Sequence, residues 1–204
     1  VQSFKASTGI KNSSGNLALH YAVQNVNEPR YDLHTCGVGL LTTNYPKAVL
    51  ESDELGRTPL HYACMGSKNN ANENKAKISY DLVVHLISIH NQLQSRPCRK
   101  DFEGNAPLHI AVTRYAPFEI IEAFTKQNLK SLSVKLFMQL NKNGDLPLHI
   151  AIKRLAEKKE SSYFPCCHKT IAVIIKAAPQ ASIVRTSSGA LPIHIATENN
   201  QSNL

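Results

Sequence analysis

The segment Asp53-Glu-Leu-Gly-Arg-Thr-Pro-Leu-His-Tyr-Ala63 decides the fold, because its last eight residues recur in four further copies. The other copies are Gly15-Asn-Leu-Ala-Leu-His-Tyr-Ala22, Gly104-Asn-Ala-Pro-Leu-His-Ile-Ala111, Gly144-Asp-Leu-Pro-Leu-His-Ile-Ala151 and Gly189-Ala-Leu-Pro-Ile-His-Ile-Ala196. The glycines at positions 15, 56, 104, 144 and 189 are successively 41, 48, 40 and 45 residues apart. Self-similarity at such a period is typical of proteins that stack small repeated units. The sequence therefore predicts five such units.

Each copy has the residues of a tight turn followed by a helix. The glycine permits a positive φ, and the short polar residue three positions earlier can bond the turn backbone. Those residues are Asn12, Asp53, Asp101, Asn141 and Thr186. In four copies a proline holds the first helical position, where its missing N–H costs nothing. The residues assigned to the structural motif are Gly56, Pro59, His61, Gly104, Pro107, His109, Gly144, Pro147, His149, Gly189, Pro192 and His194.

A second apolar segment follows each of the first four copies and predicts a second helix in the unit. The segments are Leu82–Ile89, Phe118–Phe124, Thr170–Ile175 and, in the first unit, Leu33–Asn44, which Gly37 and Gly39 weaken. Pro46 and Pro179 are expected to end two of these helices. With helices stacked in pairs, burial between units is expected for Leu19, Ala22, Leu60, Ala63, Leu108, Ala111, Leu148, Ala151, Ile193 and Ala196.

Three insertions lengthen the units. Gly66–Lys77 is polar and predicts a surface loop, while Leu155–Lys169 mixes charged residues with Tyr163-Phe164-Pro165-Cys166-Cys167-His168 and is expected to pack down. Apolar residues alternate with polar ones from Leu132 to Leu140, which is the period of a strand. We interpret that stretch as an extended finger, with a continuation of the second helix as the alternative.

The segment Asp53–Ala63 resembles the ankyrin-repeat signature almost residue for residue, and the resemblance covers residues 12–204. The Leu-Pro-Leu-His-Ile-Ala variant is similar to divergent ankyrin arrays of algae and related protists. The chain departs from the family pattern in keeping its usual Thr only as Thr58, and in having Ala18 in place of Pro. The spacings also exceed the family period of about 33 residues.

The resemblance implies an all-α ankyrin-repeat solenoid of stacked helix-turn-helix units with hairpin-like turns and inter-helix insertions. Residues 1–204 would form a single array with units at about 12–52, 53–100, 101–140, 141–185 and 186–204. The last unit is expected to be incomplete, because only Thr197–Leu204 follow its octet. More chain or a partner is expected to cover it.

The composition of the chain limits the classes of function that it could have. No stretch approaches the roughly 18 apolar residues of a membrane span, which predicts a soluble protein. The +8 formal charge is dispersed: residues 1–102 carry 11 basic and 8 acidic residues, and 103–204 carry 12 and 7. This even spread of charge argues against binding to nucleic acid and is compatible with an acidic protein partner. Five scattered cysteines predict reduced thiols, and hence the cytoplasm or another reducing compartment such as an organelle interior.

The sequence gives little support for catalysis or for metal binding. His20, His61, His109, His149 and His194 repeat at one motif position, which indicates a structural role. The adjacent Cys166-Cys167-His168 does not have zinc-ligand spacing. No nucleophile elbow, phosphate loop or H-E-x-x-H motif is present. The sequence thus predicts a non-enzyme without cofactor, metal or small-molecule substrate.

The resemblance implies that residues beside the turn glycines and after the first helices line a concave partner-binding surface. The candidates are Arg57, Phe102, Asn105, Arg114, Lys142, Asp145, Lys153 and Arg154, with Glu54, Leu55, Glu103, Thr113 and Asn143 beside them. Phe102 is the first candidate anchor, because aromatic and arginine side chains dominate interface energies. Arg114, Lys142, Lys153 and Arg154 would form a positive rim. The predicted function is a protein-binding module or scaffold. The alternatives are a regulatory or targeting segment of a longer enzyme or channel, and a fixed accessory subunit of a large assembly.

Overall fold

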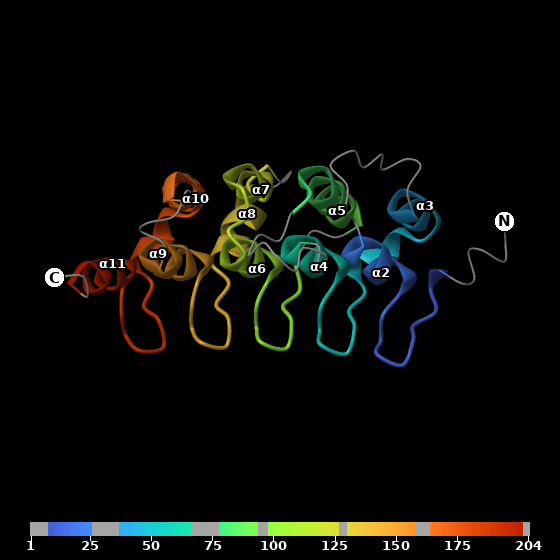
Figure 1. The fold of residues 1–204 in the computed structure, drawn as a ribbon, viewed down its shortest axis with the longest axis horizontal. Coiled ribbons are helices and arrows are strands. Elements are labelled where there is room, and N and C mark those ends of the chain that lie inside the picture. Colours follow the sequence, from blue (N-terminus) through green and yellow to red (C-terminus); the bar gives the residue numbers. More distant parts are fainter. Residues whose placement is uncertain are drawn as a thin grey trace. The chain divides into compact units, whose positions relative to one another are not determined.

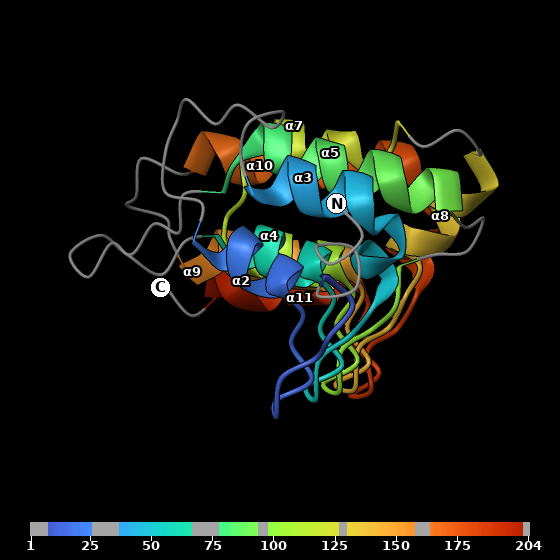
Figure 2. The same ribbon diagram turned by 90° about the vertical axis from the view of Figure 1, so that its right-hand side faces the viewer.

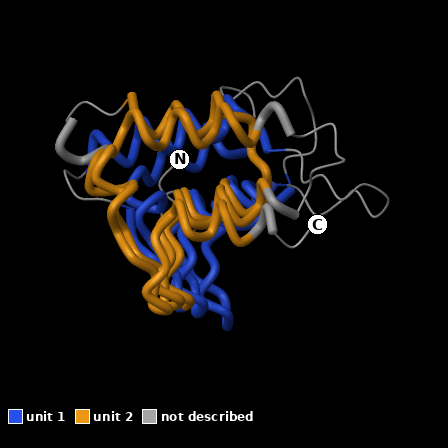
Figure 3. Tube along the Cα trace, turned by 90° about the vertical axis from the view of Figure 1, so that its left-hand side faces the viewer, with its two compact units in different colours: residues 1–102 blue, residues 103–204 orange. Residues whose placement is uncertain are grey.

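The computed structural model describes residues 8–25, 37–66, 78–93, 98–126, 130–157 and 164–201. Within these ranges the regular secondary structure is all helical and there is no strand, so the all-α prediction is confirmed. The chain divides into two compact units, residues 1–102 and 103–204 (Figure 3).

Unit 1 consists of two layers of helices with hairpin turns on one side (Figure 1). Its helices are α2 (Ala18–Gln24), α3 (Gly37–Asn44), α4 (Pro59–Met65) and α5 (Tyr80–Leu93), and the short 3-10 helix η1 (Pro46–Leu50) follows α3. The first helices α2 and α4 pack together, and α3 and α5 lie over them. Leu19, Leu60 and Leu86 are fully buried between the layers.

Unit 2 repeats this arrangement, as the turned view also shows (Figure 2). The first helices α6 (Pro107–Thr113), α9 (Pro147–Glu157) and α11 (Pro192–Gln201) pack in succession. The second helices α7 (Phe118–Ala123) and α10 (Phe164–Ala177) cover α6 and α9. The helix α8 (Lys130–Phe137) packs on α10, and η2 (Pro179–Ile183) follows α10.

Proline sets the helix boundaries as the sequence predicts. Helices α4, α6, α9 and α11 all begin at the motif proline. Helix α3 ends two residues before Pro46 and α10 ends two residues before Pro179. The residue before each of these two prolines leaves the helical region, with ψ of 74° at Tyr45 and 79° at Ala178. Each proline then starts a 3-10 turn that leads toward the next hairpin.

The strand predicted from Leu132 to Leu140 is wrong, because Lys130–Phe137 is the helix α8. Leu136 and Phe137 are neighbours in sequence and both are fully buried. A strand would have directed them to opposite faces, whereas a helix can bury two neighbours on one broad face. Leu140, the last residue of the alternating pattern, is 40% exposed.

The predicted insertion Leu155–Lys169 is shorter than expected. Helix α9 continues to Glu157, and α10 already begins at Phe164, so Phe164–His168 form a helical turn. Residues 158–163 lie outside the described ranges, as do 67–77 of the predicted Gly66–Lys77 loop. In the first unit Gly37 and Gly39 are both inside α3, and the predicted start at Leu33 lies outside the described residues.

The predicted burial between repeats holds for most motif positions. Leu19, Leu60, Leu108 and Leu148 are at most 1% exposed, and Ala63, Ala111 and Ala151 are also buried. Ala22 and Ala196 are half-buried. For Ile193 the prediction is wrong, because this side chain is 60% exposed. It lies on α11, and among the described residues no later first helix packs against α11 as α11 packs against α9.

Candidate functional site

The five hairpin turns share one backbone structure. The glycines at positions 15, 56, 104, 144 and 189 have φ between 72° and 81°. In the second turn the Gly56 N–H donates to the Asp53 carbonyl, and the Asp53 carboxylate accepts the N–H groups of Leu55 and Arg57 at 2.9 and 2.8 Å. Asn141 holds its own turn in the same way. The polar residue three positions before glycine therefore does what the sequence predicted.

Neighbouring turns within each unit are also bonded to one another. In unit 1 the Glu54 N–H donates to the Ser14 carbonyl at 3.2 Å and the Phe102 N–H donates to the Leu55 carbonyl at 3.0 Å. In unit 2 the Lys142 N–H donates to the Glu103 carbonyl at 3.1 Å, and the Ser187 hydroxyl to the Asn143 carbonyl at 2.6 Å. We call these contacts the turn ladder. They hold the side chains at the turn tips in fixed order.

Three motif histidines, His20, His109 and His149, bond a backbone carbonyl of the following repeat in the same unit. His109 is fully buried, its Nδ1 accepts the Ala106 N–H at 3.1 Å, and its Nε2 lies 3.2 Å from the Asp145 carbonyl. His149 does the same with the Leu146 N–H and the Val184 carbonyl. Because Nδ1 is an acceptor, the neutral ring carries its proton on Nε2 and donates it to that carbonyl. The histidine register is structural, as the sequence indicated.

Burial lowers the pKa of His20 and of His149 below the ordinary value of 6.5. Burial also lowers the pKa of His90. The unfolded chain therefore binds protons at a higher pH than the folded protein does. Stability contributed by these groups is full above pH 6.5 and is lost as pH falls below that value toward the lowered pKa of the folded state.

We predict that the urea midpoint of unfolding falls when the pH is lowered from 7.5 to 5.5. The reason is that the unfolded state gains protons that buried histidines in the folded state cannot accept. Urea titrations followed by helical circular dichroism at several pH values measure this. A midpoint that stays constant or rises toward pH 5.5 would contradict the prediction.

Two predicted partner-binding residues of unit 1 have different surroundings. Phe102 is 62% exposed and lies beside Leu55, which is 50% exposed on the neighbouring turn. An alanine methyl at Gly56 would come within 2.8 Å of the Phe102 ring, which shows how closely the ring covers that turn. Arg57 instead faces Asp101, with its Nε 3.8 Å from the buried carboxylate. We call Leu55 and Phe102 the apolar tip pair.

In unit 2 some of the predicted partner-binding residues are exposed to solvent, and others bond neighbouring side chains. Arg114 and Lys142 are exposed. The Lys153 ammonium donates a bond of 2.8 Å to each oxygen of the buried Asp145 carboxylate. The Asn105 side chain accepts a bond from Asn141 at 3.1 Å, which links two turns. Asp145 and Asn105 thus contribute to the fold.

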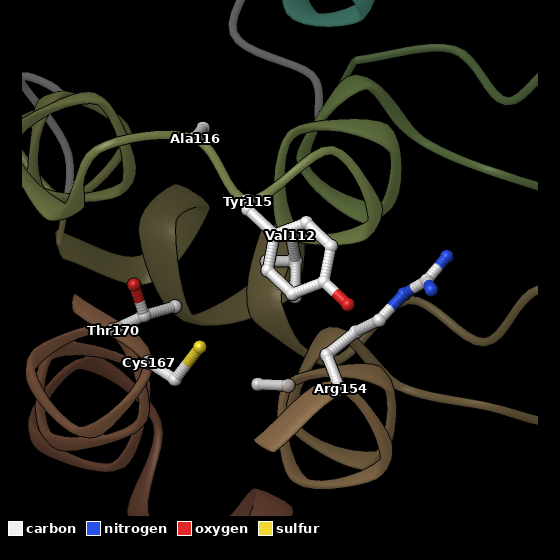
Figure 4. A pocket seen from close by; sticks show the side chains of 7 residues that line it. Val112, Tyr115, Ala116, Arg154, Cys167 and Thr170 are labelled. Atoms are coloured by element: carbon white, nitrogen blue, oxygen red, sulfur yellow. The ribbon is translucent and has the colours of Figure 1, made fainter. Parts of the chain in front are cut away.

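The structure adds a pocket that sequence reasoning missed. Tyr115 follows α6 with φ of 55° and is the non-glycine residue with positive φ among those described. The Arg154 guanidinium lies 5.3 Å from the centre of the Tyr115 ring. These two residues line a pocket with Val112, Ala116, Ala151, Cys167 and Thr170 (Figure 4). The missed signal was a bulky residue where a helix end commonly has glycine.

The described cysteines are buried thiols. Cys64, Cys98 and Cys167 are buried and form no disulfide. Burial raises the pKa of Cys98 to about 12 and that of Cys64 well above its usual value. Within the described ranges, no three His, Cys, Asp or Glu residues gather where they could hold a metal ion. The same residues include no helix of the length and apolarity needed to cross a membrane.

A turn, a helix pair and a histidine contact that recur along the chain define a protein of stacked helical repeats. Residues 55–91, which include α4 and most of α5, match the family model of the ankyrin repeat. Ankyrin repeats are in general protein–protein interaction modules. A comparison with curated proteins gives no match.

Proposed function

We propose that this protein is a non-catalytic interaction module that binds a partner protein through its turn tips and first helices. The apolar tip pair carries the proposal, because Leu55 and Phe102 are 50% and 62% exposed on adjacent turns. Exposed aromatic side chains that contribute little to folding are typical anchors of protein interfaces. The turn ladder fixes their spacing through the Phe102 N–H and the Leu55 carbonyl.

The charge of unit 2 favours an acidic partner. Residues 103–204 carry 12 basic and 7 acidic residues. Arg114 and Lys142 are exposed beside the first helix and the turn. Such charges mainly increase the rate of encounter with an acidic surface. We propose a reducing compartment as the place of action, because the five cysteines are spread along the sequence without the pattern of a disulfide framework.

We predict that the double change Leu55→Ala and Phe102→Ala lowers partner recovery by about tenfold or more, the typical loss at an interface anchor. Tagged protein is incubated in native extract of the source cells, cross-linked and analysed by mass spectrometry. Leu40→Ala is the matched control, because Leu40 is also 50% exposed in unit 1 but lies on α3, in the second layer.

Both variants are expected to melt within a few degrees of the parent, since exposed side chains contribute little to stability. Equal partner recovery by the double variant and the parent would reject the turn tips as the binding surface. Loss of the partner in the Leu40 variant alone would place the interface on the second helices.

A further inference from the structure

We propose that the pocket beside Tyr115 binds a short aliphatic side chain of a partner protein, followed in the partner by a carboxylate that pairs with Arg154. The inference rests on the proposed protein-binding function and adds a second anchor point to it. Its evidence is separate from that of the turn tips. It consists of a strained aromatic residue, a stacked cation and an open apolar pocket within unit 2.

Tyr115 occupies a position that favours glycine. The Tyr115 N–H donates to the Val112 carbonyl and the Ala116 N–H to the Ala111 carbonyl, at 3.2 and 3.0 Å. These two bonds form the Schellman motif that ends many helices, in which the first residue beyond the cap is usually glycine with positive φ. A tyrosine there is strained, because its Cβ crowds the backbone at φ of 55°. Strain of this kind points to a function of the side chain.

The ring of Tyr115 forms one wall of the pocket. Val112, Ala116 and Ala151 add carbon surface from α6, the following linker and α9. Cys167 and Thr170 on α10 face the ring from the other side (Figure 4). The pocket is partly open to solvent, and its empty space measures about 310 Å³. Apolar space of this size that is open on one side can hold a short aliphatic side chain.

Arg154 determines what can follow that aliphatic group. Of the seven lining residues it is the one that carries a charge, and its guanidinium lies over the Tyr115 ring at 5.3 Å. Its α9 neighbour Lys153 bonds Asp145 through both carboxylate oxygens. A carboxylate next to the bound aliphatic side chain can form two parallel bonds with a guanidinium while the ring supports its other face. The pocket therefore fits an aliphatic residue followed by Asp or Glu.

The test uses the dipeptide acetyl-Val-Asp-amide with the ¹⁵N-labelled full chain. Saturable amide shifts are expected at Tyr115, Ala116, Cys167 and Thr170. Acetyl-Gly-Asp-amide, which lacks the aliphatic group, should bind about tenfold more weakly. Acetyl-Val-Lys-amide should also bind more weakly, and Arg154→Gln should abolish the difference between the Asp and Lys dipeptides while the shifts at Tyr115 remain.

The change Tyr115→Gly tests the pocket without weakening the fold. This change removes the strained side chain, so the melting temperature should stay the same or rise, while the dipeptide shifts disappear. Tyr115→Asn, which tolerates positive φ, should behave in the same way. The proposal is overturned if 20 mM (on the order of a weak fragment's range) of acetyl-Val-Asp-amide gives no shift, or if Tyr115→Gly keeps the shifts.

Amide shifts confined to the turns at residues 101–105 and 141–145 would also overturn the proposal for the pocket, but they would not contradict the proposed function. Failure of the proposed function has a different signature, namely partner recovery that does not respond to the apolar tip pair.

Discussion

The change His109→Leu is expected to lower the free energy of unfolding by about 2–4 kcal/mol. Leucine fills a similar volume but can bond neither the Ala106 N–H nor the Asp145 carbonyl, which lie 3.1 and 3.2 Å from the ring nitrogens. Each buried polar group left without a partner costs about 1–3 kcal/mol. Urea unfolding followed by circular dichroism measures the difference.

His194→Leu is the matched control within the same motif. His194 is exposed, and its Nδ1 accepts the Leu191 N–H at the longer distance of 3.3 Å. In the part of the chain that the structure describes, its Nε2 bonds no carbonyl of a following repeat. The cost should stay below about 1 kcal/mol. Similar losses at positions 109 and 194 would show that the contact between repeats adds little.

The change Gly104→Ala is expected to cost about 2–5 kcal/mol. At φ of 75° an alanine is strained by about 1–2 kcal/mol. Its methyl would also lie 2.7 Å from the Lys142 backbone nitrogen and 3.1 Å from the Asn141 carbonyl carbon. Backbone atoms cannot rotate away as a flexible side chain can, so the turn ladder must shift at a further cost of about 1–3 kcal/mol.

Gly189→Ala isolates the backbone part of that cost. Its φ is 81°, but a methyl there would meet no atom within 4 Å. The expected loss is therefore about 1–2 kcal/mol, from strain alone. Chemical unfolding of both variants in parallel gives the comparison. An equal loss at positions 104 and 189 would mean that close approach between turns contributes nothing to stability.

Most of the fold could be predicted because its signals are local and repeated. A glycine, a proline and a histidine recur at fixed offsets, and each acts on its own turn or on the next one. Pro59 and Pro107 begin helices as expected. His109 and His149 were predicted to be structural, and the ring of each bonds a carbonyl of the next repeat.

The remaining features depend on contacts that no local pattern encodes. The alternation from Leu132 to Leu140 suggested a strand, but Leu136 and Phe137 are both buried inside unit 2, where the helix α8 packs on α10. Ile193 has the sequence context of a buried residue, and its exposure depends on what packs against α11. Asp145 was predicted to lie on the partner surface. Its carboxylate accepts two bonds from Lys153, which lies eight residues later on the helix α9.

The turn ladder has a consequence for molecular recognition. Because the N–H of one turn tip is bonded to the carbonyl of its neighbour, the tips are preorganised before any encounter. A ligand that docks on them loses its own conformational freedom, while the protein loses very little. Exchanging a solvent-facing tip residue such as Lys142 can then change which ligand is accepted without altering the scaffold that presents it.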